Sequence, residues 1–191
     1  MNIYHFPQLP TITHRHRLLI ILFLITSAIL GCSVADKTPD MDLLTAIDKQ
    51  NMRVITQHMD AGTDPNYVPI PEGMPFAGAH PIHLAVLKAD TKILQILLDH
   101  GADINMAAKN SDKAPPLSWA AFFLVEEIAA FLVESGADLN RIDAHGLTPL
   151  DASNLASRLN TGDAGKRAIA KRIIELLKEN GALTSKDLGD K

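Results

Sequence analysis

Gly101-Ala102-Asp103-Ile104-Asn105 and Gly136-Ala137-Asp138-Leu139-Asn140 are two nearly identical stretches in this chain of 191 residues. An internal echo of this kind indicates that one small structural unit has been repeated. The similarity continues upstream, because an alanine stands sixteen residues before each glycine, Ala85 in one case and Ala120 in the other. Whole segments of the chain therefore correspond, and not only their last five residues.

Two weaker copies of the same segment lie on either side of this pair. Ala46 stands sixteen residues before Gly62, and Asp64-Pro65-Asn66 takes the place of the Asp-x-Asn ending. At the other end, residues 143–151 open a fourth segment that closes at Gly181-Ala182. We therefore predict a repeat domain over residues 41–183, with units at 41–66, 80–105, 114–140 and 143–183.

The repeated residues resemble the ankyrin repeat, in which a turn, Thr-Pro-Leu-His-x-Ala and a Leu-rich second helix precede Gly-Ala-Asp-x-Asn. Pro81-Ile82-His83-Leu84-Ala85 and Thr148-Pro149-Leu150 carry the first part of that pattern in this chain. The resemblance implies an all-α solenoid of about four helix-turn-helix repeats with extended turns.

The steps between successive glycines are longer than the family period of about 33 residues, at 39, 35 and 45 residues. Counting from each repeat's last Asn to the next proline places the first two excesses in the turns before Pro81 and Pro116. The remaining excess length lies inside the fourth repeat. There we expect residues 161–166 to form an inserted loop between its two helices.

The hydrophobic periodicity supports paired helices without any reference to a family. Ile93, Leu94 and Leu97 fall on one stripe of a helix, and Ile128 and Leu132 do the same in the next repeat. Glycine then follows each stripe, where it can adopt the left-handed conformation that ends a helix. A single unit would expose its stripe, so stability must come from stacking against neighbouring units.

The first 31 residues read as an export signal and not as part of the fold. Arg15 and Arg17 precede thirteen overwhelmingly apolar residues, 18–30, which are too few to span a bilayer as a helix. Gly31 and then Cys32, the single cysteine of the chain, follow this apolar core. The stretch resembles a bacterial lipoprotein signal, in which this cysteine becomes the acylated first residue of the mature protein.

Two other interpretations of this segment stay open: cleavage near Ser33-Val34-Ala35 by the ordinary signal peptidase, and an uncleaved anchor. With the lipoprotein interpretation, residues 32–40 form a tether and residues 184–191 a tail after the repeats. Serine at position 33, directly after the cysteine, resembles the signals that send lipoproteins to the outer membrane of Gram-negative bacteria. We therefore expect a lipid-anchored protein of the bacterial cell envelope, in the outer membrane facing the periplasm.

Charge and cysteine usage narrow the possible partners. The formal net charge is −4, and removal of residues 1–31, which contain two basic residues and no acid, makes it −6. This balance excludes a general attraction to nucleic acid. No cysteine remains outside the anchor, so neither a disulfide nor a cysteine metal site is expected. We expect a monomer.

Sequence signals for chemistry are weak. His83 occupies the His position of the resembled repeat, which implies a structural hydrogen bond to the neighbouring repeat. His80 is three residues earlier, but Pro81 intervenes and should leave His80 just outside the helix, so a metal site is disfavoured. Residues 161–166 lack the phosphate-loop spacing. We expect no catalytic residue, metal, cofactor or small-molecule substrate.

Partner binding is the remaining function, and the resemblance places it on the concave side, made of turn tips and first helices. The residues two positions after the repeated alanine should face this side: Asp48, Leu87, Phe122 and Leu155. The residues that follow them in each repeat form an adjoining set: Lys49, Lys88, Phe123 and Ala156. An apolar strip of Leu87, Phe122 and Leu155 would be a binding surface. Alternatively, Phe122 and Phe123 belong to the core. Trp119 is expected to be core.

The longest turn, residues 67–79, is the second candidate. It holds three prolines, which restrict its conformations, and large apolar or aromatic side chains that offer contact area: Tyr67, Ile70, Met74 and Phe76. The turn either contacts a partner or folds back to cap the first repeat.

Together these features predict a non-enzymatic module that binds another protein at the cell envelope through its concave face and turn loops. Alternatives are a periplasmic immunity protein against a delivered toxin, an accessory factor for a periplasmic enzyme such as one of oxidant defence, and a structural envelope protein.

Overall fold

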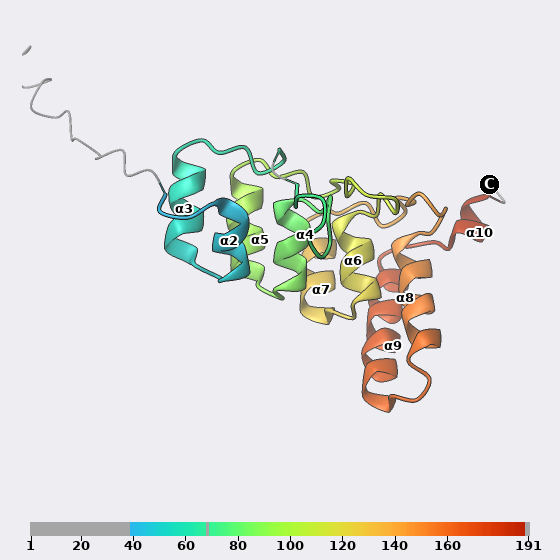
Figure 1. The fold of residues 1–191 in the computed structure, drawn as a ribbon. Helices are drawn as coiled ribbons and strands as arrows, with labels where there is room; N and C mark the ends of the chain where they lie inside the picture. The colour runs from blue at the N-terminus through green and yellow to red at the C-terminus, as the bar shows by residue number, and fades with distance from the viewer. Residues whose placement is uncertain (1–38, 68, 190–191) are drawn as a thin grey trace, which may run out of the picture. The chain divides into compact units, whose positions relative to one another are not determined.

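The computed structural model describes residues 39–67 and 69–189, and every regular element in this part of the chain is a helix (Figure 1). The helices are α2 (Leu43–Asp48), α3 (Met52–Asp60), α4 (Pro81–Leu87), α5 (Thr91–Asp99), α6 (Pro116–Phe122), α7 (Glu126–Glu134), α8 (Pro149–Leu159), α9 (Ala164–Glu179) and α10 (Ser185–Gly189). The predicted all-α fold is confirmed.

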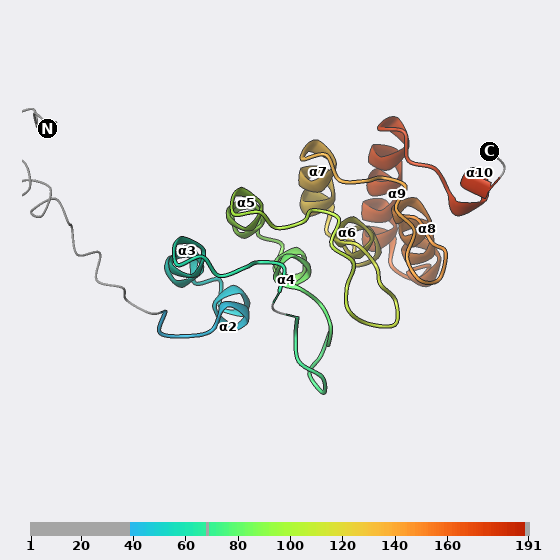
Figure 2. The ribbon, with the colours of Figure 1, turned by 90° about the horizontal axis from the view of Figure 1, so that it is seen from above.

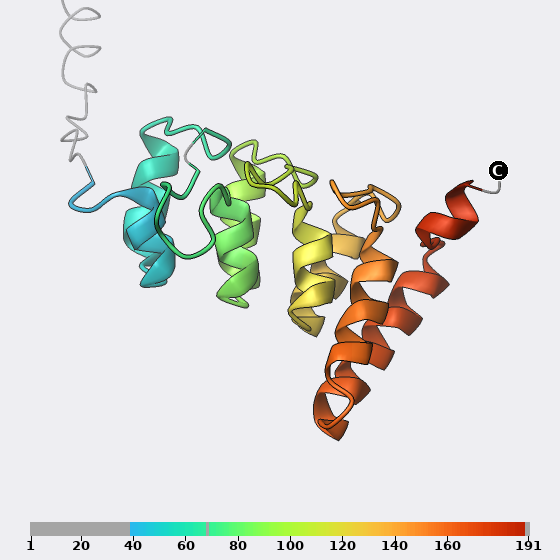
Figure 3. The same cartoon turned by 45° about the vertical axis from the view of Figure 1, so that its right-hand side comes forward.

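Consecutive helices from α2 to α9 form four pairs, and the pairs stack into two layers. The first helices α2, α4, α6 and α8 make one layer, and the second helices α3, α5, α7 and α9 make the other (Figure 2). Turns that connect one pair to the next lie along a common edge (Figure 3). Both lengthened turns, before α4 and before α6, therefore extend from the same edge.

The core lies between the two layers. The repeated alanines Ala46, Ala85 and Ala120 are completely buried, as are Ile93 and Ile128 from the second helices. Helices α2 to α7 have only six to nine residues each. Isolated helices shorter than about 12 residues are marginal in water, so their stability depends on packing against neighbouring pairs.

The Gly-Ala part of the repeated stretch ends the second helix. Gly101 has a φ of +86° and donates from its N–H to the Leu98 carbonyl, while Ala102 donates to the Leu97 carbonyl. These two bonds form a Schellman motif, in which the last carbonyls of a helix are satisfied by a turn that favours glycine. The same pair of bonds follows α7 and α9.

The Asp-x-Asn part connects each repeat to the next one. Asp103 Oδ1 accepts a hydrogen bond from the Asn105 N–H, and Asn105 Oδ1 accepts one from the Asp138 N–H of the following repeat at 2.8 Å. Asn66 makes the corresponding bond to the N–H of Asp103, and Asn140 makes it to the N–H of Leu183. The repeated asparagine thus fixes the spacing of adjacent turns.

The prediction of an inserted loop in the fourth repeat is wrong. The extra residues lengthen the helices instead, giving 11 residues in α8 and 16 in α9. Asp163 Oδ1 accepts a hydrogen bond from the Lys166 N–H and so caps α9, which places residues 164–166 in its first turn. A short turn, residues 160–163, joins the two helices.

Several predicted segments lie outside the described residues. These are the signal segment 1–31, Cys32 and the tether as far as residue 38.

The predicted tail is described as far as residue 189, and residues 185–189 form α10. Thr184, directly before α10, exchanges hydrogen bonds with Asp187. Across the described ranges, every helix is too short or too polar to cross a membrane.

The asparagine bonds give a first prediction. Asn105→Ala should lower the free energy of unfolding by about 0.5–1.5 kcal/mol, the net contribution of one hydrogen bond, because the Asp138 N–H loses its protein partner. Urea denaturation of the wild type and the variant measures this loss. Asn180→Ala is the matched control, since the Asn180 amide bonds only the Leu176 carbonyl of its own helix. Equal losses in the two variants would contradict the proposed role of Asn105.

Candidate binding site on the first-helix face

The base of the 67–79 turn is fixed by backbone hydrogen bonds. The Ile70 N–H donates to the Ala79 carbonyl at 2.7 Å, and the Gly78 N–H donates to the Ile70 carbonyl at 2.8 Å. The Lys109 N–H from the next lengthened turn donates to the Gly78 carbonyl at 2.6 Å. A Cβ at Gly78, whose φ is +80°, would overlap the Lys109 carbonyl, so only glycine fits there.

The tip of this turn packs on α6 through an aromatic cluster, which we define as Phe76, Trp119, Phe122 and Phe123. The Phe76 ring centroid lies 5.7 Å from that of Trp119 and 6.0 Å from that of Phe123. Phe123 in turn lies 5.6 Å from Trp119 and 5.3 Å from Phe122. Tilted and edge-to-face pairs at these separations are favourable.

A groove of about 510 Å³, here called the aromatic groove, opens beside this cluster. One wall is the turn tip with Phe76 and Ala77, and the opposite wall is the turn before α8 with Asp143, His145 and Leu147. The remaining lining comes from the 110–114 turn and from α6 and α8: Asn110, Asp112, Ala114, Ser118, Trp119, Phe122, Phe123, Ala152 and Leu155.

A second groove of about 780 Å³, here called the loop groove, lies on the other side of the turn tip. The turn contributes Ile70, Pro71, Met74, Pro75 and Phe76, and helices α2 and α4 contribute the rest: Leu44, Thr45, Asp48, Leu84, Leu87 and Lys88, with Asp42 before α2. Lys88 Nζ and Asp48 Oδ1 form an ion pair of 2.6 Å across the two helices. Phe76 is thus shared by both grooves.

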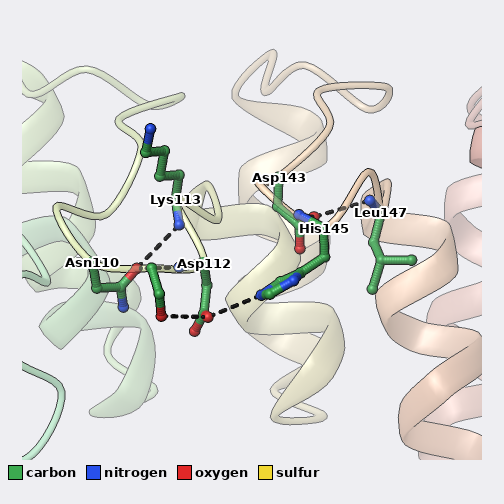
Figure 4. A network of polar contacts seen from close by, with 7 residues as sticks. Asn110, Asp112, Lys113, Asp143, His145 and Leu147 are labelled. Atoms are coloured by element: carbon green, nitrogen blue, oxygen red, sulfur yellow. Dashed lines mark hydrogen bonds and ion pairs between the residues drawn. The ribbon is translucent and has the colours of Figure 1, made fainter.

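Two acidic side chains and one histidine, Asp112, Asp143 and His145, form the rim of the aromatic groove. Figure 4 shows them in a network of polar contacts with their neighbours. Asp112 Oδ1 lies 3.1 Å from His145 Nε2, and the Asp112 carbonyl accepts a bond from the Ala144 N–H. Asp143 Oδ1 accepts bonds from the N–H groups of His145 and Leu147. The hydrogen bond with Asp112 raises the pKa of His145, and the same bond lowers the pKa of Asp112.

The predicted apolar strip is present in part and is divided in two. Phe122 and Phe123 are 38% and 42% exposed, so the interpretation that places them at the surface holds. Phe122 and Leu155 line the aromatic groove, whereas Leu87 lines the loop groove. Ala156 is buried and does not continue the column. Trp119, at 6% exposure, is in the core as predicted and also forms groove wall.

The four predicted residues of the turn do not share one environment. Met74 and Phe76 are exposed at the tip, and Ile70 is buried at the base. Tyr67 is 79% exposed and lines neither groove. The turn folds back on the array, but its aromatic contacts are with α6 of the third repeat, and so it is not simply a cap on the first repeat.

Sequence reasoning missed Asp112, Asp143, His145 and Ser118 as groove residues. Asp112 lies in a turn of irregular length, so its position opposite His145 could not be derived from the repeat spacing. A usable signal existed for Ser118, because it stands where the second repeat has His83. A departure from the repeated pattern at a buried position marks a place where the scaffold is not optimised.

His83 has the structural role that the resemblance implied. Its Nδ1 accepts a bond from the His80 N–H, which leaves the proton on Nε2 to donate to the Ala114 carbonyl at 3.1 Å. Burial lowers the pKa of His83 to about 4. His80 is the N-cap of α4, outside the helix as predicted. Among the described residues, no group of three His, Cys, Asp or Glu side chains could hold a metal ion.

Comparison with known proteins agrees with this geometry. A family model of three ankyrin repeats matches residues 43–153, which is more than half of the chain. The chain belongs to the ankyrin-repeat family. Ankyrin repeats are scaffolds for protein–protein interaction, and this general role applies to the present ankyrin-repeat protein.

Individual relatives are similar over parts of the chain. Neurogenic locus notch homolog protein 2 of Homo sapiens is 30% identical over 115 residues, and the Mus musculus protein gives the same values. That alignment covers 60% of this chain but only 4% of the notch proteins. A putative ankyrin repeat protein of Borreliella burgdorferi is 33% identical over 73 residues, which is 38% of this chain and 32% of that protein.

The contributions of His83 and His145 to folding stability should change with pH in opposite directions. Because the folded state keeps His83 neutral down to about pH 4, the unfolded chain binds the extra proton first. Stability is then lost as the pH falls from about 6.5 to 4, by up to about 3.5 kcal/mol at about 1.4 kcal/mol per pKa unit. The advantage of the wild type over His83→Gln should therefore shrink in acid, as measured by urea denaturation at several pH values.

His145→Gln is the matched comparison. The pKa of His145 is raised, so the stability from its pair with Asp112 is present at low pH and is lost as the pH rises through the folded-state pKa. The advantage of the wild type over this variant should grow in acid. Parallel pH profiles for the two variants would show that the assigned environments are wrong.

Proposed function

We propose that this ankyrin-repeat protein is a non-enzymatic binding module, anchored in the bacterial cell envelope, that binds another protein through its first helices and turn loops. The observation that carries the proposal is the aromatic cluster, where Phe76, Phe122 and Phe123 are all more than a third exposed. Exposed aromatic side chains flanked by charge are the usual composition of an interface hot spot.

The construction of this face supports the proposal. Backbone bonds at Ile70, Gly78 and Lys109 hold the base of the turn, so little conformational freedom at the base would be lost on binding. The Phe76 ring at the tip is held against Trp119 and Phe123. Grooves on both sides of Phe76 offer concave surface for a partner's side chains.

The ionisable groups at the rim of the aromatic groove are held in place by hydrogen bonds, as in a preformed binding surface. His145 pairs with Asp112 at 3.1 Å. Asp143 accepts two backbone N–H groups within its own turn. These bonds fix the shape of the groove rim, and we propose that its ionisable groups act in binding.

The anchor is proposed from the sequence. Cys32 follows an apolar segment of thirteen residues and Gly31, as in bacterial lipoprotein signals, and acyl chains on it would hold the repeats at a membrane. We place the protein as a monomer in the outer membrane, facing the periplasm. The partner would then be a protein of the same compartment.

Crosslinking in intact cells followed by affinity purification of the full-length protein tests the binding role. The wild type should recover a defined partner. Phe122→Glu combined with replacement of residues 71–77 by Asn-Gly should reduce that recovery at least tenfold, because the change removes the turn-tip wall of the aromatic groove and places a charge in its α6 lining. The short replacement suits the site, since the Gly78 N–H to Ile70 carbonyl bond would close a two-residue turn.

Leu159→Glu is the control for this experiment, because Leu159 is an exposed apolar residue of α8 that lines neither groove. Its recovery of partner should equal that of the wild type. Unchanged recovery by the groove variant would exclude this face as the binding site. The identity of the recovered protein would separate the alternatives: a toxin would indicate immunity, a periplasmic enzyme an accessory role, and no dedicated partner a structural role.

Metabolic labelling with a clickable palmitate analogue tests the anchor. The wild type should incorporate the label and partition with the membranes, and Cys32→Ala should lose both properties because no other cysteine is available. Ser33→Ala is the control and should keep the label. Labelling that persists in Cys32→Ala would contradict a lipoprotein anchor.

A further inference from the structure

We propose that the aromatic groove binds an extended peptide segment of the partner, in which a large apolar side chain lies close to a lysine or arginine. This inference rests on the proposed binding function and specifies which groove is used and what it recognises. Three features of the groove carry it: the hydroxyl of Ser118, the acidic rim and the size of the space between two turns.

The groove exists because the third repeat lacks a side chain that the second repeat has. In the second repeat, the His83 imidazole reaches the carbonyl of Ala114, two residues before Pro116 of the next repeat. Ser118 stands at the corresponding position of the third repeat, and Leu147 is two residues before the next such proline, Pro149. A serine is too short to make this bridge, and both Ser118 and Leu147 line the groove.

The Ser118 hydroxyl is left without a partner by this exchange. The side chain is only 3% exposed, and within the described part of the chain its Oγ makes no hydrogen bond. An unmade bond at a buried hydroxyl costs about 1–3 kcal/mol. The Oγ itself has less than 1 Å² of exposed surface. A peptide that displaces the side chains covering it would supply backbone N–H and C=O groups, which are the partners that this hydroxyl lacks.

The charge of the rim selects a basic segment. The ionisable lining residues are Asp112, Asp143 and His145, which give a net negative charge whether or not His145 is protonated. The rings of Trp119, Phe122 and Phe123 also line the groove, and aromatic rings attract cations as well as apolar groups. A lysine or arginine at the rim with an apolar neighbour on the floor would complement both surfaces, and an acidic segment would be repelled.

The dimensions favour a single extended segment. About 510 Å³ lies between the 76–77 tip and the 143–147 turn, within the range of pockets that hold small ligands and a few side chains. Both walls are turns anchored at their bases by backbone bonds, Lys109 to Gly78 for one and Ala144 to Asp112 for the other. A second copy of this chain, which is net acidic, is disfavoured as the occupant by charge.

A display library of random twelve-residue peptides, selected against the full-length protein, tests the inference. Enriched peptides should combine an aromatic or large aliphatic residue with a lysine or arginine within three positions, and should be depleted of Asp and Glu. Ser118→Ala should weaken the binding of the best synthetic peptide about fivefold, the equivalent of one hydrogen bond. The unfolding midpoint of the Ser118→Ala protein in urea should not fall, because the removed hydroxyl has no partner in the folded protein.

Three further variants complete the design. Ser118→His should fill the groove and reduce peptide affinity more than tenfold, again without loss of stability. Asp112→Asn should weaken binding and lower its dependence on salt, since it removes a rim charge while keeping an acceptor for His145. Ser135→Ala, an exposed serine at the end of α7, should match the wild type.

Each contrary result has a definite meaning. Peptides that bind Ser118→His as well as the wild type, or that are acidic, would overturn the inference. A selection without enriched peptides would also overturn it, and if crosslinking still recovers a partner, the proposed binding function stands while the peptide mode fails. Self-association of the chain in sedimentation, abolished by Ser118→His, would replace the peptide by a second copy.

Discussion

The dependence of each helix pair on its neighbours determines the rest of this structure. Helices of six to nine residues cannot persist alone, and their apolar stripes are covered only when pairs stack. The asparagine side chains that accept N–H groups from the next repeat keep the turns in step. Extra residues can therefore enter the turns, or extend the last pair, without disturbing the stack.

The candidate site arises where the third repeat departs from this regular pattern. Phe122 and Phe123 add aromatic bulk at the end of α6, and Ser118 removes a bridge to the fourth repeat. The preceding turn is long enough to reach over and place Phe76 on the same cluster. Scaffold and site thus come from different residues: the repeated ones stack the helices, and the exceptional ones shape the two grooves.

Sequence alone predicts the parts of this protein that obey the repeat. The sixteen-residue spacing and the Gly-Ala-Asp-x-Asn endings indicated the helix pairs, and the position of His83 indicated its bond to the next repeat. The contact between Phe76 and α6 and the pair of Asp112 with His145 join turns of irregular length, so no spacing rule predicts them. The fourth repeat misled because excess length can extend helices as well as loops.

The bond between Gly78 and Lys109 makes the two lengthened turns one mechanical unit, because the base of one is tied to the backbone of the other. Residues 71–77 are then a variable segment between fixed ends, because backbone bonds at Ile70, Gly78 and Lys109 hold the base of the turn. Phe76 within this segment packs on Trp119 and Phe123, so changes at the other positions of the segment leave that contact in place. Related proteins could acquire new partners through substitutions within residues 71–77 alone, without a change in the stability of the repeats that support this segment.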